Sequence, residues 1–469
     1  MDGANLVDLL GRWASGRGPL YLLLAARLRV LIDDGVLPSG RALPPDRVLA
    51  RRLAVGRGTV VSAYDLLQQE GRVVRRQGSG TRVAAHRLPA TRTADGVPAN
   101  PLIQHLIHPD DGVLLLTCAA PATAPPLVTD AYREAAERLA ARPDDLGYHP
   151  AGHPELREAL AAYYRARDVP TTADEIVVTT GAQHAISLLT ALLVAPGDTV
   201  LAETPTYPGA LEAFRHAAAA VRPLRVGERA SGALMYAVPT ASNPSGSIMP
   251  DQERRRLAEY AVRADTPLVD DEVCAELCFS GRTPPPLAAF ARRAEHVLTV
   301  GSLSKLVWGG MRVGWIRAAA PLATRLARLR AVHDLAGEAV SQLAAASLVR
   351  RTAEIRRGRI PELRRRHDHL CAELRTHLPA WTFTPALGGQ TLWVRLPDAD
   401  SDAFSQIALR HGVAVPPGRA FDPLGGHGDH IRLHYLFPEE DLTRAVRALA
   451  LAWRAYDGAT APAVPSLVV

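Results

Sequence analysis

Between residues 175 and 301 the sequence alternates short β-branched runs with helix-length segments, and this alternation restricts the possible folds more than any other feature. The runs are EIVVTT, TVLAE, LMYAVP, PLVDD and HVLTVG, beginning at residues 175, 199, 234, 267 and 296. Such alternation is typical of β-α-β units. It predicts an α/β fold with a mainly parallel sheet covered by helices on both faces. Because ligands of these sheets bind where the strands end, a functional site is expected at the strand exits.

Each run is followed by a residue type that could bind one part of a phosphorylated aromatic ring. After the first run, Gly181 permits a tight turn and the amides of Ala182 and Gln183 open a helix, where a phosphate is favourably held. Taken singly, such residues are also common in turns, caps and cores. The later exits offer a stacking ring, an amide, three acids, a lysine and an arginine: Tyr207, Asn243, Asp270 to Glu272, Lys305 and Arg312. Together, and in this order, they predict a pocket for pyridoxal 5'-phosphate (PLP).

Lys305 is the only lysine among 54 lysines and arginines. A lysine amine can lose its proton and attack a carbonyl carbon, whereas a guanidinium stays charged and cannot. One reading is the chance survival of a surface lysine in a chain that otherwise uses arginine. The other is a lysine that forms a Schiff base, and its position after the fifth run favours this second reading.

The overall composition indicates a folded, multidomain chain. A length of 469 residues with 47% hydrophobic and 22% charged residues predicts two or three domains. The apolar stretches are shorter than the ~20 residues that cross a bilayer, and the N-terminus lacks the pattern of a signal peptide, so we expect a cytoplasmic protein without a membrane partner. The cysteines form no Cys-x-x-Cys pair and the histidines no His-Glu-x-x-His motif, which predicts neither a metal site nor a disulfide.

The first 90 residues carry the surplus positive charge of the chain. They hold 14 arginines and seven acidic residues, a net charge of +7, whereas the whole chain carries +6. Their sequence pattern predicts three helices within residues 20–71 and two short strands around the turn GSG. Three helices followed by such a wing predict a winged helix-turn-helix. The charge then indicates binding to a polyanion, although a solvated basic face would give the same count.

Residues 43–83, LPPDRVLARRLAVGRGTVVSAYDLLQQEGRVVRRQGSGTRV, resemble the DNA-binding domain of the GntR family. The resemblance implies contacts with operator DNA from five positions: Arg47, Arg57, Thr59, Gln77 and Gly78. Arginines at a helix N-terminus suit phosphates and guanine edges, although Arg47 and Arg57 could also be ordinary exposed residues. Gly56 and Gly58 stand where the family usually carries side chains. The operator sequence is therefore not predicted.

The rest of the chain resembles the fold-type I aminotransferases, through LGYHPAGHPELREAL, NPSG, SLSK and HIRLHYLF. The resemblance implies that Lys305 forms the Schiff base with PLP, that Asp271 pairs with the pyridine nitrogen and that Asn243 reaches the ring oxygen. It implies further cofactor contacts, the first of them supplied by a partner subunit, from Tyr148, Gly181, Ala182, Gln183, Tyr207, Ser302 and Arg312. It also implies that Arg432 holds the carboxylate of an effector in a bidentate manner.

Cys274 departs from this pattern, because the superfamily usually has a tyrosine there whose hydroxyl also reaches the ring oxygen. A thiol is a weaker hydrogen-bond donor. We therefore expect PLP to bind next to Cys274 without efficient turnover, although a residual aminotransferase half-reaction stays open.

A GntR-like winged helix followed by a linker and an aminotransferase-like domain resembles the MocR/GabR transcription regulators. The expected bounds are 1–83, 84–108 and 109–469, the last with a large part at about 150–335 and a smaller α+β part at about 109–149 and 336–469. The resemblance implies operator DNA as a partner, a domain-swapped homodimer, and a small amino compound or PLP itself as the effector.

Two other functions are compatible with the sequence. One is a working aminotransferase with an appended DNA-binding module, and the other is a DNA-binding protein whose pocket has lost its cofactor. The sequence predicts neither the effector nor the operator, and it does not indicate whether the protein activates or represses.

Overall fold

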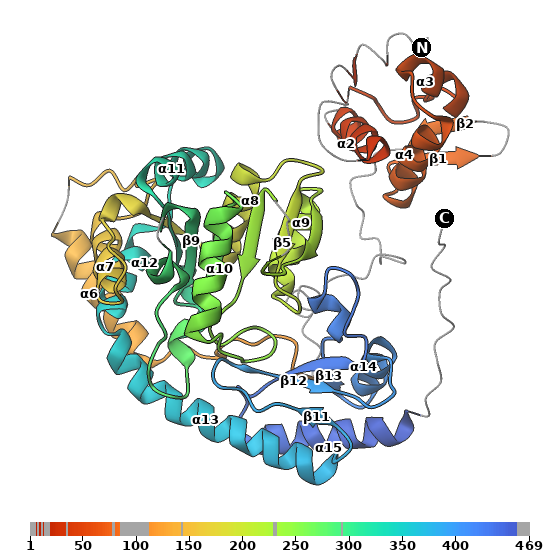
Figure 1. Ribbon diagram of the computed structural model, residues 1–469. Coiled ribbons are helices and arrows are strands. Elements are labelled where there is room, and N and C mark those ends of the chain that lie inside the picture. The colour runs from red at the N-terminus through yellow and green to blue at the C-terminus, as the bar shows by residue number, and fades with distance from the viewer. Residues whose placement is uncertain are drawn as a thin grey trace. The chain divides into compact units, whose positions relative to one another are not determined.

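In the computed structural model, the alternating runs belong to a seven-stranded sheet in the order β4-β10-β9-β8-β7-β5-β6. Figure 1 labels β5 and β9 of this sheet, with helix α10 beside them in the view. Neighbours β5, β7, β8 and β9 are parallel, whereas β10 is antiparallel to both β4 and β9. The strands are β4 (Ile176–Thr179), β5 (Thr199–Ala202), β6 (Ala220–Pro223), β7 (Leu234–Ala237), β8 (Leu268–Asp271), β9 (Val297–Ser302) and β10 (Gly314–Arg317). The predicted mainly parallel sheet is confirmed.

The structure describes residues 19–33, 36–76, 80–84, 112–141, 144–227, 232–291 and 294–456, and before them residues 6, 9, 10 and 13. The chain divides into two compact units, with one break between residues 97 and 98. Each unit is therefore described by itself. The bounds predicted for the domains and the linker remain a prediction.

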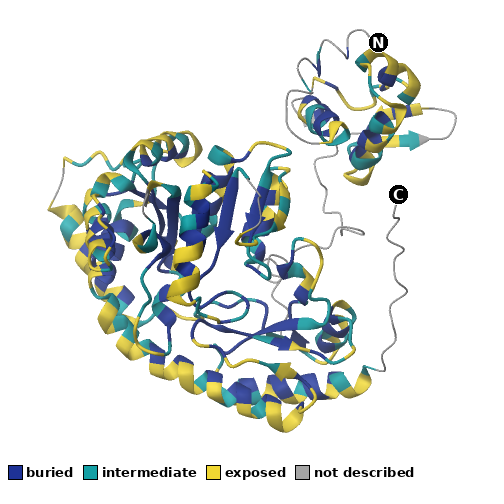
Figure 2. Cartoon of the chain, in the orientation of Figure 1, coloured by how far each residue is buried: buried dark blue, intermediate teal, exposed yellow. Residues whose placement is uncertain are grey.

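Every residue of β4, β7, β8, β9 and β10 is buried (Figure 2). Such strands need cover on both faces, which explains why the runs are continuously apolar instead of alternating with polar residues. The helices of this part are α6 (Pro126–Ala140), α7 (Pro154–Arg165), α8 (Ala182–Leu193), α9 (Pro208–His216), α10 (Asp251–Arg263), α11 (Ala320–Asp334) and α12 (Ala339–Arg350).

A smaller α+β part follows the long helix α13 (Thr352–His377). Its antiparallel sheet has the order β11-β12-β14, and its helices are α14 (Ser401–Arg410) and α15 (Glu439–Ala455). The strands are β11 (Thr382–Phe383), β12 (Thr391–Arg395) and β14 (His430–His434). This arrangement places β14, which carries Arg432, among elements of the small part.

The segment that opens the aminotransferase-like part is tied to this smaller part. Strand β3 (Leu114–Leu115) pairs in parallel with β13 (Val413–Ala414). In addition, the side chain of His434 lies 3.0 Å from the carbonyl oxygen of Leu115. The chain then continues through Thr117 and Ala119, whose contacts are described below.

The N-terminal unit contains helices α2 (Leu20–Asp33), α3 (Asp46–Leu53) and α4 (Arg57–Gln69), followed by the antiparallel wing β1 (Val73–Arg76) and β2 (Gly80–Val83). Its core is made of apolar residues from all three helices and both strands. Pro44 and Pro45 precede α3 as expected, since proline suits the entry to a helix. The predicted winged helix-turn-helix is confirmed. Among the described residues, no helix combines the length and the apolar character that crossing a membrane requires.

Candidate functional site

Residues that the sequence predicts at separate strand exits lie together at the carboxyl edge of the sheet. The hydroxyl of Tyr207 lies close enough to Asp271, Arg432 and Arg312 for electrostatic interaction with their charges. Lys305 in turn lies in the field of Asp271 and Arg432. Chain segments more than 200 residues apart thus meet in one region.

The predicted phosphate-binding turn has the shape of a cradle. Gly181 has a φ of +102°, a backbone conformation that favours glycine, and a Cβ atom there would lie 3.2 Å from Nη2 of Arg312. Arg312 donates a hydrogen bond to the carbonyl oxygen of Thr180 at 2.7 Å. Helix α8 begins at Ala182, so its first N–H groups and the exposed Arg312 side chain could bind an anion together.

Gln183 and Ser302 lie beside this cradle. Nε2 of Gln183 donates to the carbonyl oxygen of Gly209 at 2.8 Å, while its buried Oε1 has no partner among the described residues. Ser302 is buried, and its hydroxyl lies 3.0 Å from the carbonyl oxygen of Val313 and accepts the amide of Ser304 at 3.1 Å. Both side chains are thus fixed by the fold, and Gln183 keeps a free acceptor.

Lys305 follows β9 and donates a hydrogen bond from Nζ to the carbonyl oxygen of Ala119 at 2.6 Å. No ion pair of the described residues includes it. Burial lowers the pKa of the amine, because a desolvated ammonium is disfavoured. A lysine with a lowered pKa is a better nucleophile, which is the property that a Schiff-base lysine needs.

Asp271 is the last residue of β8, and each of its two carboxylate oxygens accepts a hydrogen bond from the protein. The hydroxyl of Tyr236 donates to its Oδ2 at 2.5 Å, and the amide of Val273 donates to its Oδ1 at 3.0 Å. Burial raises the pKa of Asp271, and these two hydrogen bonds oppose that rise. The donors stabilise the charged form of a carboxylate that would otherwise be costly to bury.

The two acids beside Asp271 have different partners. Glu272 forms a bidentate ion pair with Arg167, with Nη2 to Oε1 at 2.6 Å and Nη1 to Oε2 at 2.9 Å. Asp270 accepts the amide of Leu287 at 2.7 Å on Oδ2, whereas its buried Oδ1 has no partner among the described residues. Burial, reinforced by the negative charge of Glu272, raises the pKa of Asp270 to about 8. Of the three acids, Asp271 is the one whose charge interacts with that of Lys305.

The pH dependence of stability should report on Asp270. In the unfolded chain its carboxyl ionises near its ordinary pKa of about 4, so between that pH and about 8 the folded protein binds the extra proton. This contribution to stability is complete below the unfolded pKa and is lost as the pH rises through the folded one, at about 1.4 kcal/mol per pH unit. We expect Asp270→Asn to remove that slope in chemical denaturation between pH 5.5 and 8. Parallel curves for the two proteins would contradict the assignment.

Arg432 is a buried cation in β14, 1% exposed. Its Nη2 donates to the carbonyl oxygen of Thr117, its Nη1 lies 3.5 Å from Oδ1 of Asn243, and its guanidinium lies 5.2 Å from the ring centroid of Phe421. Its Nε has no partner, and no ion pair of the described residues includes Arg432. Burial lowers its pKa to about 10. A guanidinium buried without a counter-ion is suited to receive an anionic ligand.

Cys274 lies close to Lys305 and Asp271, and burial raises the pKa of its thiol to about 12. A thiol that stays protonated can only act as a weak donor. The structure thus places the residue that departs from the family pattern beside the lysine. Its effect on turnover stays a prediction.

Tyr148 is 62% exposed and follows Gly147, whose amide donates to the carboxylate of Asp145 at 2.8 Å. An exposed aromatic side chain on an ordered loop is compatible with contribution to another subunit, which stays a prediction. Asp145, His149 and His153 carry ligand-type atoms within 4.8 Å of one another.

One histidine of this group also has a structural role at the start of α7. Nδ1 of His153 accepts the amide of Glu155 at 3.2 Å and thereby caps the helix. Its Nε2 lies 3.7 Å from the carboxylate of Asp145. The expected absence of a metal stays a prediction.

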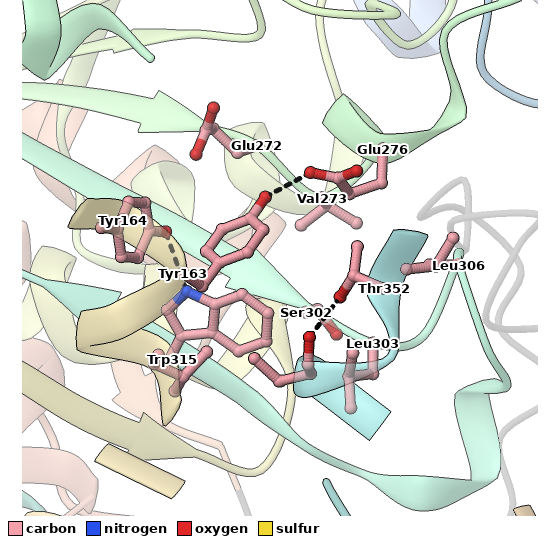
Figure 3. A pocket seen from close by; sticks show the side chains of 12 residues that line it. Tyr163, Tyr164, Glu272, Val273, Glu276, Ser302, Leu303, Leu306, Trp315 and Thr352 are labelled. Atoms are coloured by element: carbon pink, nitrogen blue, oxygen red, sulfur yellow. Dashed lines mark hydrogen bonds between the residues drawn. The ribbon is translucent and has the colours of Figure 1, made fainter. Parts of the chain in front are cut away.

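A small cavity of about 20 Å³ lies beside the site and shares Ser302 with it (Figure 3). Its wall includes Glu276, which accepts the hydroxyl of Tyr163 at 2.5 Å, and Tyr164, which accepts the indole N–H of Trp315 at 2.9 Å. This volume holds about one water molecule. The cavity is therefore part of the support behind the site and does not receive the cofactor.

In the winged helix, Arg47, Arg57 and Gly58 are exposed, and Thr59 is partly exposed. Arg57 opens α4 and lies 3.7 Å from Asp46 at the start of α3. A Cβ atom on Gly58 would meet nothing within 4 Å, which agrees with a sparse base-reading surface. The predicted wing-tip contacts Gln77 and Gly78 lie outside the described residues.

Sequence reasoning missed several groups that the structure places at the site. Gln390 donates from Nε2 to the carbonyl oxygen of Lys305 at 3.1 Å, and Tyr236 contacts Asp271. Thr117 and Ala119 act through backbone carbonyl groups, for which no side-chain pattern exists. The run LMYAVP contains Tyr236, but its apolar neighbours indicate only a core strand.

Comparison with known proteins agrees with both units. Residues 121–449 match the family described as aminotransferase class I and II, and residues 20–83 match the gntR family of bacterial regulatory proteins. The HTH-type transcriptional regulator YisV of Bacillus subtilis is 26% identical over 479 aligned positions, which cover 94% of this chain and 98% of that protein. The probable rhizopine catabolism regulatory protein MocR of Rhizobium meliloti is 29% identical over 343 positions, 64% of this chain and 65% of that protein.

Among solved structures, LysN, the alpha-aminoadipate aminotransferase of Thermus thermophilus complexed with N-(5'-phosphopyridoxyl)-L-leucine, superposes with a TM-score of 0.68. It is 26% identical and covers 76% of this chain and 95% of its own. The predicted fold-type I architecture is thus confirmed. The chain belongs to the aminotransferase class I and II family and carries a GntR-type winged helix-turn-helix ahead of that domain, the organisation of the MocR/GabR regulators that its sequence resembles.

Proposed function

We propose that this protein is a PLP-dependent transcription regulator, in which the winged helix binds operator DNA and the aminotransferase-like domain senses an amino compound. Membership of the aminotransferase family and the phosphopyridoxyl complex of LysN imply dependence on PLP. The gntR match implies DNA binding, and both YisV and MocR are named as regulators.

The residues of the site fit PLP. Helix α8 begins next to Gly181, and the guanidinium of Arg312 lies beside that glycine, which suits a phosphate. Asp271 offers a carboxylate, and Lys305 offers an amine without a counter-ion. PLP supplies an aldehyde that exchanges amines reversibly.

Each side chain then has a definite task. Arg312 and the N-terminus of α8 would hold the phosphate, Tyr207 would cover the ring, and Ser302 and Gln183 would complete the cradle. Asn243 and Cys274 would serve the ring oxygen, with Cys274 the weaker donor of the two. Tyr148 completes the phosphate site from the partner protomer of a domain-swapped homodimer.

One observation carries the sensing function. The two cations that would meet an amino acid are both held by the same short segment, since Arg432 donates to the carbonyl oxygen of Thr117 and Lys305 to that of Ala119. In the sequence this segment lies about ten residues after the expected end of the linker from the winged helix. A ligand carboxylate would compete with the carbonyl group of Thr117 for Arg432, and an incoming amine would change whether Lys305 is free to donate to Ala119. Ligand binding would thereby bias the conformation of this segment.

A DNA-binding assay tests this function. A fragment from upstream of the gene is titrated with the PLP-loaded protein, with and without each of the protein amino acids. We expect an amino acid to change the affinity or the footprint, and Arg432→Met to require roughly ten- to a hundredfold more of it, the worth of charge-assisted hydrogen bonds. The amine that lacks the carboxylate should act equally on both proteins. Arg57→Ala serves as the variant with weakened DNA binding.

Other outcomes would identify the alternatives. Steady release of a keto acid from the loaded protein, without any effect on DNA, would indicate a working aminotransferase. A change in the footprint on addition of PLP alone would make the cofactor itself the effector. Specific DNA binding by a protein that takes up no PLP would leave only the DNA-binding function.

A further inference from the structure

Tyr236 is a buried tyrosine of β7 for which neither the family resemblance nor the sequence pattern gives a role. Its side chain is 0% exposed, and its ring meets that of Phe214 edge-on with centroids 5.7 Å apart. Its hydroxyl donates to Oδ2 of Asp271 at 2.5 Å. A hydrogen bond from a hydroxyl to an ionised carboxylate is stronger than one between neutral groups.

The hydrogen bond has a fixed direction and geometry. Oδ1 of Asp271 is occupied by the amide of Val273 at 3.0 Å, so each carboxylate oxygen has one protein donor and the plane of the carboxylate is set. Tyr236 is itself held in place, because its strand lies between β5 and β8 and its carbonyl oxygen accepts the amide of Glu203. An ionised carboxylate can accept a further hydrogen bond, and this is the lone pair that a ring nitrogen would use.

We propose that Tyr236 is a positioning residue that orients Asp271 and keeps it ionised, so that a proton shared with the cofactor resides on the ring nitrogen. This inference rests on the proposed binding of PLP. With PLP bound, the carboxylate of Asp271 and the ring nitrogen of the cofactor would share one proton. A donor to the carboxylate stabilises the charged pair, whereas its loss favours the neutral acid and the neutral ring.

Several titratable groups face Asp271 and share its field. They are Glu203 after β5, Tyr236 from β7, Tyr207 ahead of α9, Lys305 after β9, and the neighbours Glu272 and Cys274. Of these, Tyr236 makes a direct hydrogen bond to the carboxylate. Tyr236→Phe removes that donor and leaves the ring and the charges of the other groups unchanged.

The first measurement uses the PLP-loaded protein and follows the absorption of the bound cofactor against pH. We expect the pH at the midpoint of the absorption change to rise by about one unit in Tyr236→Phe. The free energy of one hydrogen bond to a charged group corresponds to a shift of about that size. Asp271→Asn should shift it at least as far in the same direction. The matched control is Tyr164→Phe, because Tyr164 is equally buried and its hydroxyl is bonded to Trp315 instead. An unchanged midpoint in Tyr236→Phe, or an equal shift in Tyr164→Phe, would overturn the proposal.

The second measurement needs no cofactor. In the free protein, the stability cost of Tyr236→Phe should grow with pH, because an ionised Asp271 loses a donor that the protonated acid does not need. The cost of Tyr164→Phe should not depend on pH. If PLP does not bind but this dependence is found, the proposed cofactor is wrong and the control of Asp271 by Tyr236 stands. A cost of Tyr236→Phe that is flat with pH removes the proposal whether or not PLP binds.

Discussion

Replacing Arg167 with methionine is expected to lower the free energy of unfolding by about 3–5 kcal/mol, because it leaves the buried carboxylate of Glu272 without its partner. The two side chains are 10% and 3% exposed and form two hydrogen bonds. Arg167 also donates to the carbonyl oxygen of Pro284 at 2.9 Å and to the hydroxyl of Tyr163 at 2.7 Å. Chemical denaturation at neutral pH measures the loss.

Two comparisons isolate the effect of burial. Arg165 makes an ion pair with Glu158 at the same N to O distance of 2.6 Å, but the side chains are 45% and 58% exposed. Arg165→Met should therefore cost about 1 kcal/mol or less. The double variant Arg167→Met with Glu272→Gln should recover much of the loss, since no buried charge remains unpaired. Equal costs for Arg167→Met and Arg165→Met would show that the buried pair contributes no more than a surface pair.

The site depends on this separation of three adjacent acids. Glu272 forms an ion pair with Arg167, and burial raises the pKa of Asp270. Burial raises the pKa of Asp271, two donors oppose that rise, and Asp271 lies close enough to Lys305 for their charges to interact. Three consecutive carboxyl groups at the end of a buried strand are costly, and three different local solutions make them compatible with folding.

Much of the fold follows from the sequence because the strands are buried on both faces. All five predicted runs became strands of one sheet. The antiparallel strand β10 and the edge strand β6 were not predicted, since four residues such as GWIR carry no periodicity that distinguishes a strand from a turn. Their positions are decided by packing against strands distant in the sequence.

Prediction of the site was limited in a similar way. Lys305, Asp271 and Arg432 could be found because their side chains have unusual chemistry at a strand exit or in a family motif. The carbonyl groups of Thr117 and Ala119 could not be predicted, because the backbone of every residue offers the same carbonyl acceptor. Contacts made through the backbone become visible only once the tertiary structure brings the chain segments together.

The largest effect of all should come from Lys305, and the decisive variant is Lys305→Arg. Arginine retains the positive charge and can still donate to the carbonyl oxygen of Ala119, the contact that Lys305 makes at 2.6 Å, but a guanidinium does not attack an aldehyde. Borohydride treatment of the PLP-loaded protein should attach the cofactor at residue 305 of the native chain and nowhere in Lys305→Arg, as read by peptide mass spectrometry. If charge and hydrogen bonding alone held the sensor together, Lys305→Arg would still answer amino acids in the DNA assay. We expect that it does not, while its DNA binding without ligand stays native, because the winged helix folds around a core of its own.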